Sequence, residues 1–197
     1  MLIEVTGHPC SGKTYILNKS QFKNSVFKKY VGIFRAPKLL FLVVYYTFID
    51  ELVRDLISIV FISKEKAYTK LVLIFNIIDK YHYSKKLRSP RDKIMIDEGA
   101  IHIIFNLLTT DESRVWEVTD QKEILHRLPQ PGKLFLVKTS KEIQAERLSK
   151  RGHKRMKHAN DFIRITREVS KYIELNFRGD ISVISNATEL KKSFENT

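Results

Sequence analysis

Short apolar runs alternate along this chain with longer stretches of helical periodicity. The apolar runs predict five strands, at residues 2–5, 30–34, 93–97, 134–138 and 181–184. Helical spacing predicts further helices, at residues 15–23, 100–108, 122–128, 141–150, 160–177 and 188–194. Because the predicted strands are apolar throughout rather than alternating, they are typical of a parallel sheet that helices cover on both faces.

Residues 38–83 carry the longest helical pattern and predict two or three helices. Ser63 opens a polar break within this pattern and is the expected N-cap of the helix that follows. Two apolar runs, at residues 39–49 and 56–62, are separated by charged residues. Because neither run reaches the roughly 20 residues of a bilayer span, we expect buried or interfacial helices here. The polar, basic residues 84–92 predict a loop.

The sequence has 197 residues and no internal repeat or linker-like tract, so we expect a single domain over residues 1–197. The formal net charge of +13 suits nucleotides, nucleic acid, sugar phosphates or an acidic membrane surface, and equally a solvated basic surface. The single cysteine, Cys10, excludes a disulfide within the chain, so we expect the reducing cytoplasm as its location. The apolar stretch at residues 1–5 is too short for the core of a signal peptide.

Residues 7–14, Gly-His-Pro-Cys-Ser-Gly-Lys-Thr, fit the pattern G-x-x-x-x-G-K-[ST] of a phosphate-binding loop (P-loop, or Walker A motif). Gly7 would permit a tight turn out of the strand, and Gly12 would let a phosphate approach the backbone. Lys13 is expected to bridge β- and γ-phosphate oxygens, and Thr14 to offer its hydroxyl to Mg²⁺. The predicted nucleotide-binding residues are Gly7, His8, Pro9, Cys10, Ser11, Gly12, Lys13, Thr14 and Tyr15. The alternative is a glycine-rich turn that binds no ligand.

Asp97 and Glu98 follow the third predicted strand. A carboxylate at this point can hold the water shell of Mg²⁺, so Thr14 and Asp97 are the predicted metal-binding residues. Glu98, or Asp97 itself, would orient or deprotonate an attacking hydroxyl. The alternative is a structural role, in which Asp97 caps the helix that begins near residue 100.

A basic segment follows the fourth predicted strand. Arg147 and Arg151 are four residues apart and share one face of a helix, and Gly152 would act as a hinge. Guanidinium groups on a closing lid stabilise the negative charge of a phosphoryl group in transfer. The alternative is a solvated basic helix end, where cations are favoured by the helix dipole.

Together, residues 7–14, the pair Asp97 and Glu98, and the pattern E-R-x-x-x-R-G at residues 146–152 resemble the nucleoside and nucleotide kinases, thymidylate kinase most of all. The resemblance implies a three-layer α/β/α P-loop kinase fold, a five-stranded parallel sheet in the order 2-3-1-4-5, and ATP and Mg²⁺ as cofactors. It implies a lid at about residues 147–159 and a helical acceptor side at about residues 38–83. It also implies that the turn after the last strand packs against adenine.

Two departures from these kinases leave the acceptor open. Thymidylate kinases carry Asp-Arg-Tyr or Asp-Arg-His after the third strand, whereas residues 97–99 are Asp-Glu-Gly. Deoxynucleoside kinases have an acidic residue just after the second strand, where Arg35 stands here. We therefore expect an ATP-dependent phosphotransferase that acts on a nucleoside, a nucleotide or a sugar. Its expected catalytic residues are Lys13, Asp97, Glu98, Arg147 and Arg151.

A P-loop ATP hydrolase or a nucleotide-dependent regulatory module is the alternative function. Residues 94–98 are three apolar residues followed by Asp-Glu, a pattern that would suit a hydrolase in which Glu98 activates water. The sequence has neither an Asn-Lys-x-Asp guanine-reading motif nor a Leu-Ser-Gly-Gly-Gln signature. Nucleic-acid binding ranks below both, because the basic residues at 85–93 lack interleaved aromatic residues. Contact with an anionic membrane and a homodimer remain open.

Overall fold

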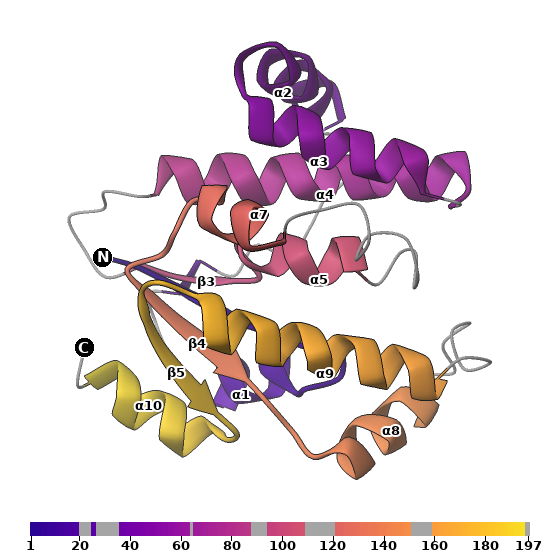
Figure 1. Cartoon of the computed structure of the whole chain (residues 1–197). Coiled ribbons are helices and arrows are strands. Elements are labelled where there is room, and N and C mark those ends of the chain that lie inside the picture. Colours follow the sequence, from indigo (N-terminus) through magenta and orange to yellow (C-terminus); the bar gives the residue numbers. More distant parts are fainter. Residues whose placement is uncertain are drawn as a thin grey trace.

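The computed structural model (Figure 1) describes residues 1–19, 25–26, 36–63, 65–87, 94–108, 121–150 and 159–195. Within these ranges, a parallel sheet lies between two layers of helices, and three more helices stack beyond one of those layers. This arrangement confirms the predicted α/β class with a parallel sheet.

The sheet has the strand order β2-β3-β1-β4-β5, and all its neighbouring strands are parallel. The central strand β1 (Leu2–Gly7) pairs with β3 (Ile94–Asp97) on one side and with β4 (Lys133–Val137) on the other. The strand β5 (Asp180–Ile184) follows β4, and β2 (Ser25–Val26) pairs with β3. β1 and β4 are buried along their whole length, as is typical of central strands in a sheet with two covered faces.

The second strand lies at a different place from the one predicted. The apolar run at residues 30–34 falls outside the described residues, whereas β2 is Ser25–Val26 and pairs with Met95 and Ile96. With two residues, β2 adds little to a sheet whose body is formed by β3, β1, β4 and β5. Apolar periodicity could not place this strand, because an edge strand is selected by its pairing with a neighbour rather than by its own residues.

One face of the sheet is covered by α1 (Lys13–Lys19) and α10 (Ala187–Glu195). Alternate strand residues face this layer because successive side chains of a strand point to opposite faces. The apolar cluster on this face consists of Ile3, Val5, Ile16, Leu17, Met95, Phe135, Val137, Ile184 and Leu190.

The opposite face is covered by α5 (His102–Leu108), α7 (Gln121–Arg127) and α9 (Ala159–Asn176). Leu134 and Leu136 of β4 point to this side. They join a large cluster with side chains of these three helices, including Phe105, Leu125, Ile165 and Val169. The helix α8 (Lys141–Lys150) packs against α9 at the end of the sheet where the strands finish.

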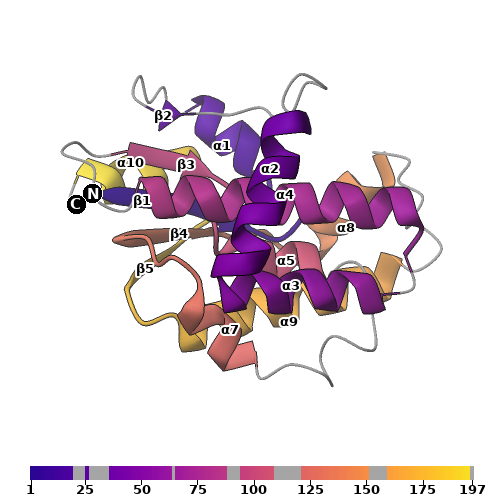
Figure 2. The same cartoon turned by 90° about the horizontal axis from the view of Figure 1, so that it is seen from above.

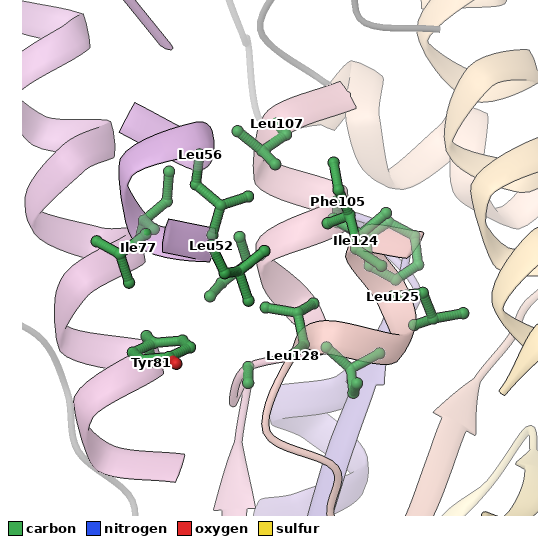
Figure 3. Packing of buried hydrophobic residues seen from close by; sticks show 14 of the residues in the cluster. Leu52, Leu56, Ile77, Tyr81, Phe105, Leu107, Ile124, Leu125 and Leu128 are labelled. Carbon is green, nitrogen blue, oxygen red and sulfur yellow. The ribbon is translucent and has the colours of Figure 1, made fainter. Parts of the chain in front are cut away.

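Three helices, α2 (Ala36–Ile49), α3 (Glu51–Ile62) and α4 (Ala67–Lys86), stack beyond α5 and α7 (Figures 1 and 2). Figure 3 shows the core that they share with α5 and α7, with the labelled side chains Leu52, Leu56, Ile77, Tyr81, Phe105, Leu107, Ile124, Leu125 and Leu128. Among the described helices, none is both long enough and apolar enough to cross a bilayer.

Two predictions about this helical region are wrong. Ser63 does not cap α4; it ends α3, where its hydroxyl donates a hydrogen bond to the carbonyl of Val60. α4 also continues into the segment predicted as a loop. Ser84 in this extension is buried and accepts a hydrogen bond from the N–H of Ala100, so tertiary contacts hold a turn of helix whose polar composition predicted a loop.

Asp50 fixes the corner between α2 and α3 to α4. Its carboxylate caps α3 by accepting a hydrogen bond from the N–H of Val53. It also accepts hydrogen bonds from the Tyr81 hydroxyl (2.5 Å) and the Lys85 ammonium (3.3 Å). Burial alone would raise the pKa of Asp50, but the hydrogen bonds from Tyr81 and Lys85 outweigh it and bring the pKa below its ordinary value.

Replacing Asp50 with alanine is expected to lower the free energy of unfolding by about 2 kcal/mol, because a helix cap and charged hydrogen bonds are lost. The folded-state pKa of Asp50 lies below the ordinary value of 3.8. The stabilisation is therefore present above that value and is lost as the pH falls through the folded-state pKa. Urea unfolding of both proteins should show a clear difference at neutral pH and a smaller one at about pH 3.

Tyr81→Phe is the matched variant, because it keeps the ring and removes only the hydroxyl. It should cost about 1 kcal/mol at neutral pH. If the difference between wild type and Asp50→Ala were the same at both pH values, the assigned role of the ionised carboxylate would be wrong.

Candidate active site

The predicted phosphate-binding loop connects β1 to α1 at the carboxyl end of the sheet. Gly12 has a φ of +94°, which side chains rarely adopt. Gly7 is required for a different reason from the predicted turn: a Cβ there would lie 2.4 Å from the carbonyl oxygen of Val137 on β4. The N–H of Ser11 donates to the carbonyl of His8 at 3.0 Å and closes the loop. Both glycines of the motif thus occupy positions that exclude a side chain.

A cavity of about 550 Å³ adjoins this loop. Residues 9–15 line it, together with Glu98, His102, Arg147 and Lys150. A second cavity of about 280 Å³ is lined by Gly12 and Tyr15 and by residues 185–188, which begin at the turn after β5. The structure thus places the loop, Glu98 and one of the two predicted arginines around the same space, whereas Asp97 is not among the residues that line the larger cavity.

His8 does not line either of these cavities and instead lines a groove beside α9. Its Nδ1 lies 3.1 Å from the carbonyl oxygen of Pro9. Burial lowers the pKa of His8 to about 4, so the imidazole is neutral at physiological pH. His8 would therefore contribute to nucleotide binding through its backbone and not through its side chain.

Glu98 connects four elements of the fold through its carboxylate. One oxygen lies 2.9 Å from the Lys13 ammonium. The other lies 3.3 Å from both the Lys80 ammonium on α4 and the His102 Nε2 on α5. Burial alone would raise the pKa of Glu98, but His102, Lys13 and Lys80 hold it well below its usual range. Glu98 is therefore ionised at neutral pH.

His102 is buried and completes this network. Burial and the charge of Lys80 bring the pKa of His102 well below its ordinary value, so the ring is neutral. A neutral ring beside an ionised carboxylate donates through Nε2, which leaves Nδ1 to accept a hydrogen bond from the Thr6 hydroxyl at 2.9 Å. His102 therefore links the acidic strand end to the central strand.

The backbone of Glu98 is strained, with a φ of +58°. The left-handed conformation costs a residue with a side chain roughly 1–2 kcal/mol. The next residue, Gly99, is closely surrounded, because a Cβ there would lie 2.4 Å from the Ile96 Cδ1 and 2.6 Å from the Glu4 Oε2. Strain of this kind persists where the surroundings hold it, and it is concentrated at functional sites.

Asp97 differs from Glu98 in its environment. Burial and the charge of Glu98 raise the pKa of Asp97 to about 6. Its Oδ1 is buried and has no hydrogen-bond partner among the described residues. Mg²⁺ prefers oxygen ligands and is usually held by one or two carboxylates together with phosphates and water. A buried carboxylate oxygen without a partner among the described residues, at the end of β3, fits such a metal.

Asp97 does not cap α5, which overturns the structural alternative for this residue. The cap is Glu4 of β1, whose two oxygens accept hydrogen bonds from the backbone N–H groups of Ile101 (3.1 Å) and His102 (3.0 Å). Glu4 is completely buried, and burial raises its pKa to about 7 despite these bonds. The apolar run at residues 2–5 concealed this carboxylate, although a single acid in a buried strand is itself a signal for a buried partner.

Arg147 of α8 lies against the phosphate-binding loop. Its Nη1 donates hydrogen bonds to the carbonyl oxygens of Cys10 (3.2 Å) and Ser11 (2.9 Å). The same nitrogen would lie 2.6 Å from a Cβ on Gly12. The buried Gln144, one turn earlier, donates to the carbonyl of Pro9 and ties α8 to the same loop. Arg151 falls outside the described residues, together with the rest of the predicted lid up to residue 158.

Lys80 and His102 were not found by sequence reasoning. Lys80 lies within a helical pattern in which a lysine is typical of the solvent face, yet its side chain is only 3% exposed. His102 follows the acidic pair closely, but nothing in its neighbours distinguishes a buried histidine from an exposed one. Lys80 and His102 belong to the site because both contact Glu98. In the sequence, Lys80 lies 18 residues before Glu98 and His102 lies four residues after it.

Comparison with known proteins supports the fold. Neither a protein-family model nor a curated protein matches the sequence. Among solved structures, the chain is similar to deoxyadenosine kinase from M. mycoides with the products dCMP and a flexible dCDP bound. The TM-score is 0.56 at 13% identity, covering 100% of this chain and 97% of that one. For the same enzyme with dATP bound, the TM-score is 0.56 at 12% identity, and the match covers 100% of this chain and 98% of that one. With dCTP bound, the TM-score is 0.54 at 13% identity, and the match covers 100% of this chain and 97% of that one. The chain therefore shares the fold of this enzyme.

Replacing Glu98 with alanine is expected to lower the free energy of unfolding by about 3 kcal/mol, because Lys80 would stay buried without the carboxylate that it hydrogen-bonds. Chemical denaturation at neutral pH measures this loss. The matched control is Glu146→Ala, which removes an exposed carboxylate paired with Lys150 and should leave the free energy of unfolding nearly unchanged. Equal losses for the two variants would show that the network around Glu98 does not stabilise the fold.

Proposed function

We propose that this chain is an ATP-dependent phosphotransferase that transfers the γ-phosphoryl group of MgATP to a small-molecule acceptor: a nucleoside, a nucleotide or a sugar. The observation that carries this proposal is the ion pair between Lys13 and Glu98, at 2.9 Å, in the cavity beside the loop. It holds a positive charge where β- and γ-phosphates bind in proteins with this loop. The fold, shared with deoxyadenosine kinases, supports the same conclusion.

The nucleotide would occupy the two cavities that meet at Gly12. The phosphates would bind residues 9–15, whose loop precedes the N-terminus of α1 and so offers backbone N–H groups to an anion. The base would lie in the smaller cavity, against the turn at Ser185 and Asn186. This placement corresponds to the adenine-binding turn that the resemblance implied.

Thr14 and Asp97 would hold Mg²⁺. The pKa of about 6 leaves Asp97 largely ionised at neutral pH, and its Oδ1 is buried without a partner among the described residues. When bound, the metal neutralises charge on the β- and γ-phosphate oxygens. With Asp97 assigned to the metal, Glu98 becomes the residue that meets the acceptor.

The side chains of this site would act in a simple order. Lys13 would exchange one oxygen of Glu98 for the phosphate oxygens as the nucleotide binds. Glu98, kept ionised by its low pKa and held by Lys80, would accept a hydrogen bond from the acceptor hydroxyl and orient it for attack. Arg147 uses one nitrogen to hold the loop, and its other N–H groups would bind the transferring phosphoryl group.

We extend the proposal to the organisation of the chain. Residues 1–197 would act as one domain in the cytoplasm, with residues 38–83 on the acceptor side of the site. The segment at residues 147–159 would close over the nucleotide as a lid and bring Arg151 to the phosphates. Arg147, the first residue of this segment, supports the proposal because it already donates hydrogen bonds to the loop. It lies on α8, which ends at Lys150 within the segment.

Replacing Lys13 with alanine is expected to lower acceptor-dependent ATP consumption by about 10²-fold or more, because a charge that follows the migrating phosphoryl group is removed. ATP consumption is measured with a panel of nucleosides, nucleotides and sugars, and without any acceptor. Lys141→Ala, an exposed lysine on α8, is the matched control and should leave the rate unchanged.

Two results would contradict the proposal. Consumption of ATP that does not depend on any acceptor would favour the hydrolase. A Lys13→Ala variant as active as wild type would remove the loop from the site altogether.

Replacing Arg147 with glutamine is expected to lower kcat by roughly tenfold to a hundredfold, because guanidinium donors act on charge that develops during transfer. Arg147→Lys should restore only part of this loss, since an ammonium cannot hold the loop carbonyls with one nitrogen and present further N–H groups to the phosphoryl group with others. Steady-state kinetics with the acceptor found above measure kcat and KM separately. Arg164→Gln, an exposed arginine on α9, is the control, and an effect of equal size there would contradict the assignment.

A further inference from the structure

A third cavity, of about 400 Å³, lies between α9 and the segment that leads from β4 to α8 (Figure 1). It is here called the α9 groove, and it is lined by His8 of the loop, by Lys138 after β4, and by residues of α9 between Arg167 and Glu174. None of its described lining residues lines either of the two cavities at the candidate active site. Its volume is within the range of about 300–1,000 Å³ that is typical of small-molecule sites. The α9 groove is therefore a separate space that can hold a small ligand.

The buried part of this lining offers hydrogen-bond acceptors. His8 and Ser170 are only 1% and 2% exposed. His8 Nδ1 lies 3.1 Å from the carbonyl oxygen of Pro9, which can only accept, so Nδ1 carries the proton of the neutral ring. Nε2 is then an acceptor, and it is buried without a partner among the described residues, a state that is rare in folded proteins. The Ser170 hydroxyl already donates its proton to the carbonyl of Thr166, so its oxygen can also only accept.

The exposed part of the lining is cationic. Arg167 and Lys171 are both exposed and lie one turn apart on the same side of α9. Arg167 uses one nitrogen to donate to the carbonyl of Thr139 at 2.8 Å, which leaves further N–H groups for a ligand. Burial is the main cause of the low pKa of His8, and the positive charges of Arg167 and Lys138 lower it further. Both cations therefore lie near the imidazole.

The two acids of the α9 groove are each paired with a cation. Glu174 forms an ion pair with Lys138. Glu168 forms one with Arg164 at 3.2 Å, on the same helix. These pairs neutralise both carboxylates, so the two exposed cations of α9 give the groove an excess of positive charge.

We propose that the α9 groove binds a phosphate ligand that carries a hydroxyl group. The phosphate oxygens contact Arg167 and Lys171, and the hydroxyl donates a hydrogen bond to His8 Nε2. A phosphate monoester has close to two negative charges at neutral pH, which match the two cations, and arginine binds phosphate through parallel N–H bonds. A sugar phosphate carries the hydroxyl on its sugar, and inorganic phosphate carries it on phosphorus. This inference does not depend on the proposed phosphotransferase activity.

Isothermal titration calorimetry of the full chain tests the proposal with three probes: glucose 6-phosphate, inorganic phosphate and sulfate. Sulfate is fully deprotonated at neutral pH, so it has no O–H group to donate and would leave the buried nitrogen unpaired. At least one of the two phosphate probes should therefore bind about tenfold or more tightly than sulfate. The tighter of the two phosphates then identifies whether the hydroxyl belongs to a sugar or to the phosphate itself.

Variants separate this site from the loop at residues 7–14, which also suits phosphate. Arg167→Gln combined with Lys171→Gln should weaken binding by about tenfold or more, because both charged donors are lost. Both side chains are exposed, so circular dichroism should be unchanged. Lys191→Gln combined with Lys192→Gln makes the same change of charge at exposed positions on α10 and should bind as wild type does. Lys13→Ala should keep the binding in the α9 groove.

Four results would overturn the proposal. They are a chain that binds none of the three probes, sulfate that binds as tightly as both phosphates, binding that Lys13→Ala abolishes while the double variant on α9 keeps it, and equal losses in the two double variants. His8→Phe removes both ring nitrogens and should abolish the preference for phosphate over sulfate. A folded His8→Phe chain that kept this preference would also contradict the proposal, and the wild-type comparison decides the matter if that variant does not fold.

Discussion

The site depends on one interaction, the contact of the Glu98 carboxylate with Lys13, Lys80 and His102. Lys80 is nearly inaccessible to solvent, and an unpaired ammonium at that depth would be strongly unfavourable. The carboxylate offsets this cost, and in doing so it joins the loop at residues 7–14, β3, α4 and α5. The left-handed backbone of Glu98 shows that the chain accepts local strain to keep the contact.

The same charges shift the pKa values of two neighbouring carboxylates, Asp97 and Glu98, in opposite directions. Asp97 is partly buried beside the charge of Glu98, and its pKa rises to about 6, whereas the cations around Glu98 keep that residue ionised. Pairs of titratable groups whose environments push their pKa values apart are typical of sites that assign them different tasks. This separation is the basis for placing the metal at Asp97 and the acceptor at Glu98 in the proposed mechanism.

The helical region connects the site to the outer surface. α4 points Lys80 toward Glu98 and points Tyr81, His82 and Lys85 toward α2 and its corner. The same helix therefore supports the charge network of the site and holds α2 in place.

The sequence by itself determined the features that local patterns encode. The loop at residues 7–14, the acidic pair at residues 97–98 and the alternation of strands and helices follow from neighbouring residues, and so does Arg147 on a helix after the fourth strand. Only the tertiary structure decided that Lys80 and His102 meet Glu98 and that Glu4, not Asp97, caps α5. It also decided which short segment became β2. These outcomes depend on strand register and helix packing between distant segments. A buried lysine or histidine in a helix has the same local sequence signal as an exposed one, and the lone acid of a buried strand signals that it has a partner but not which one.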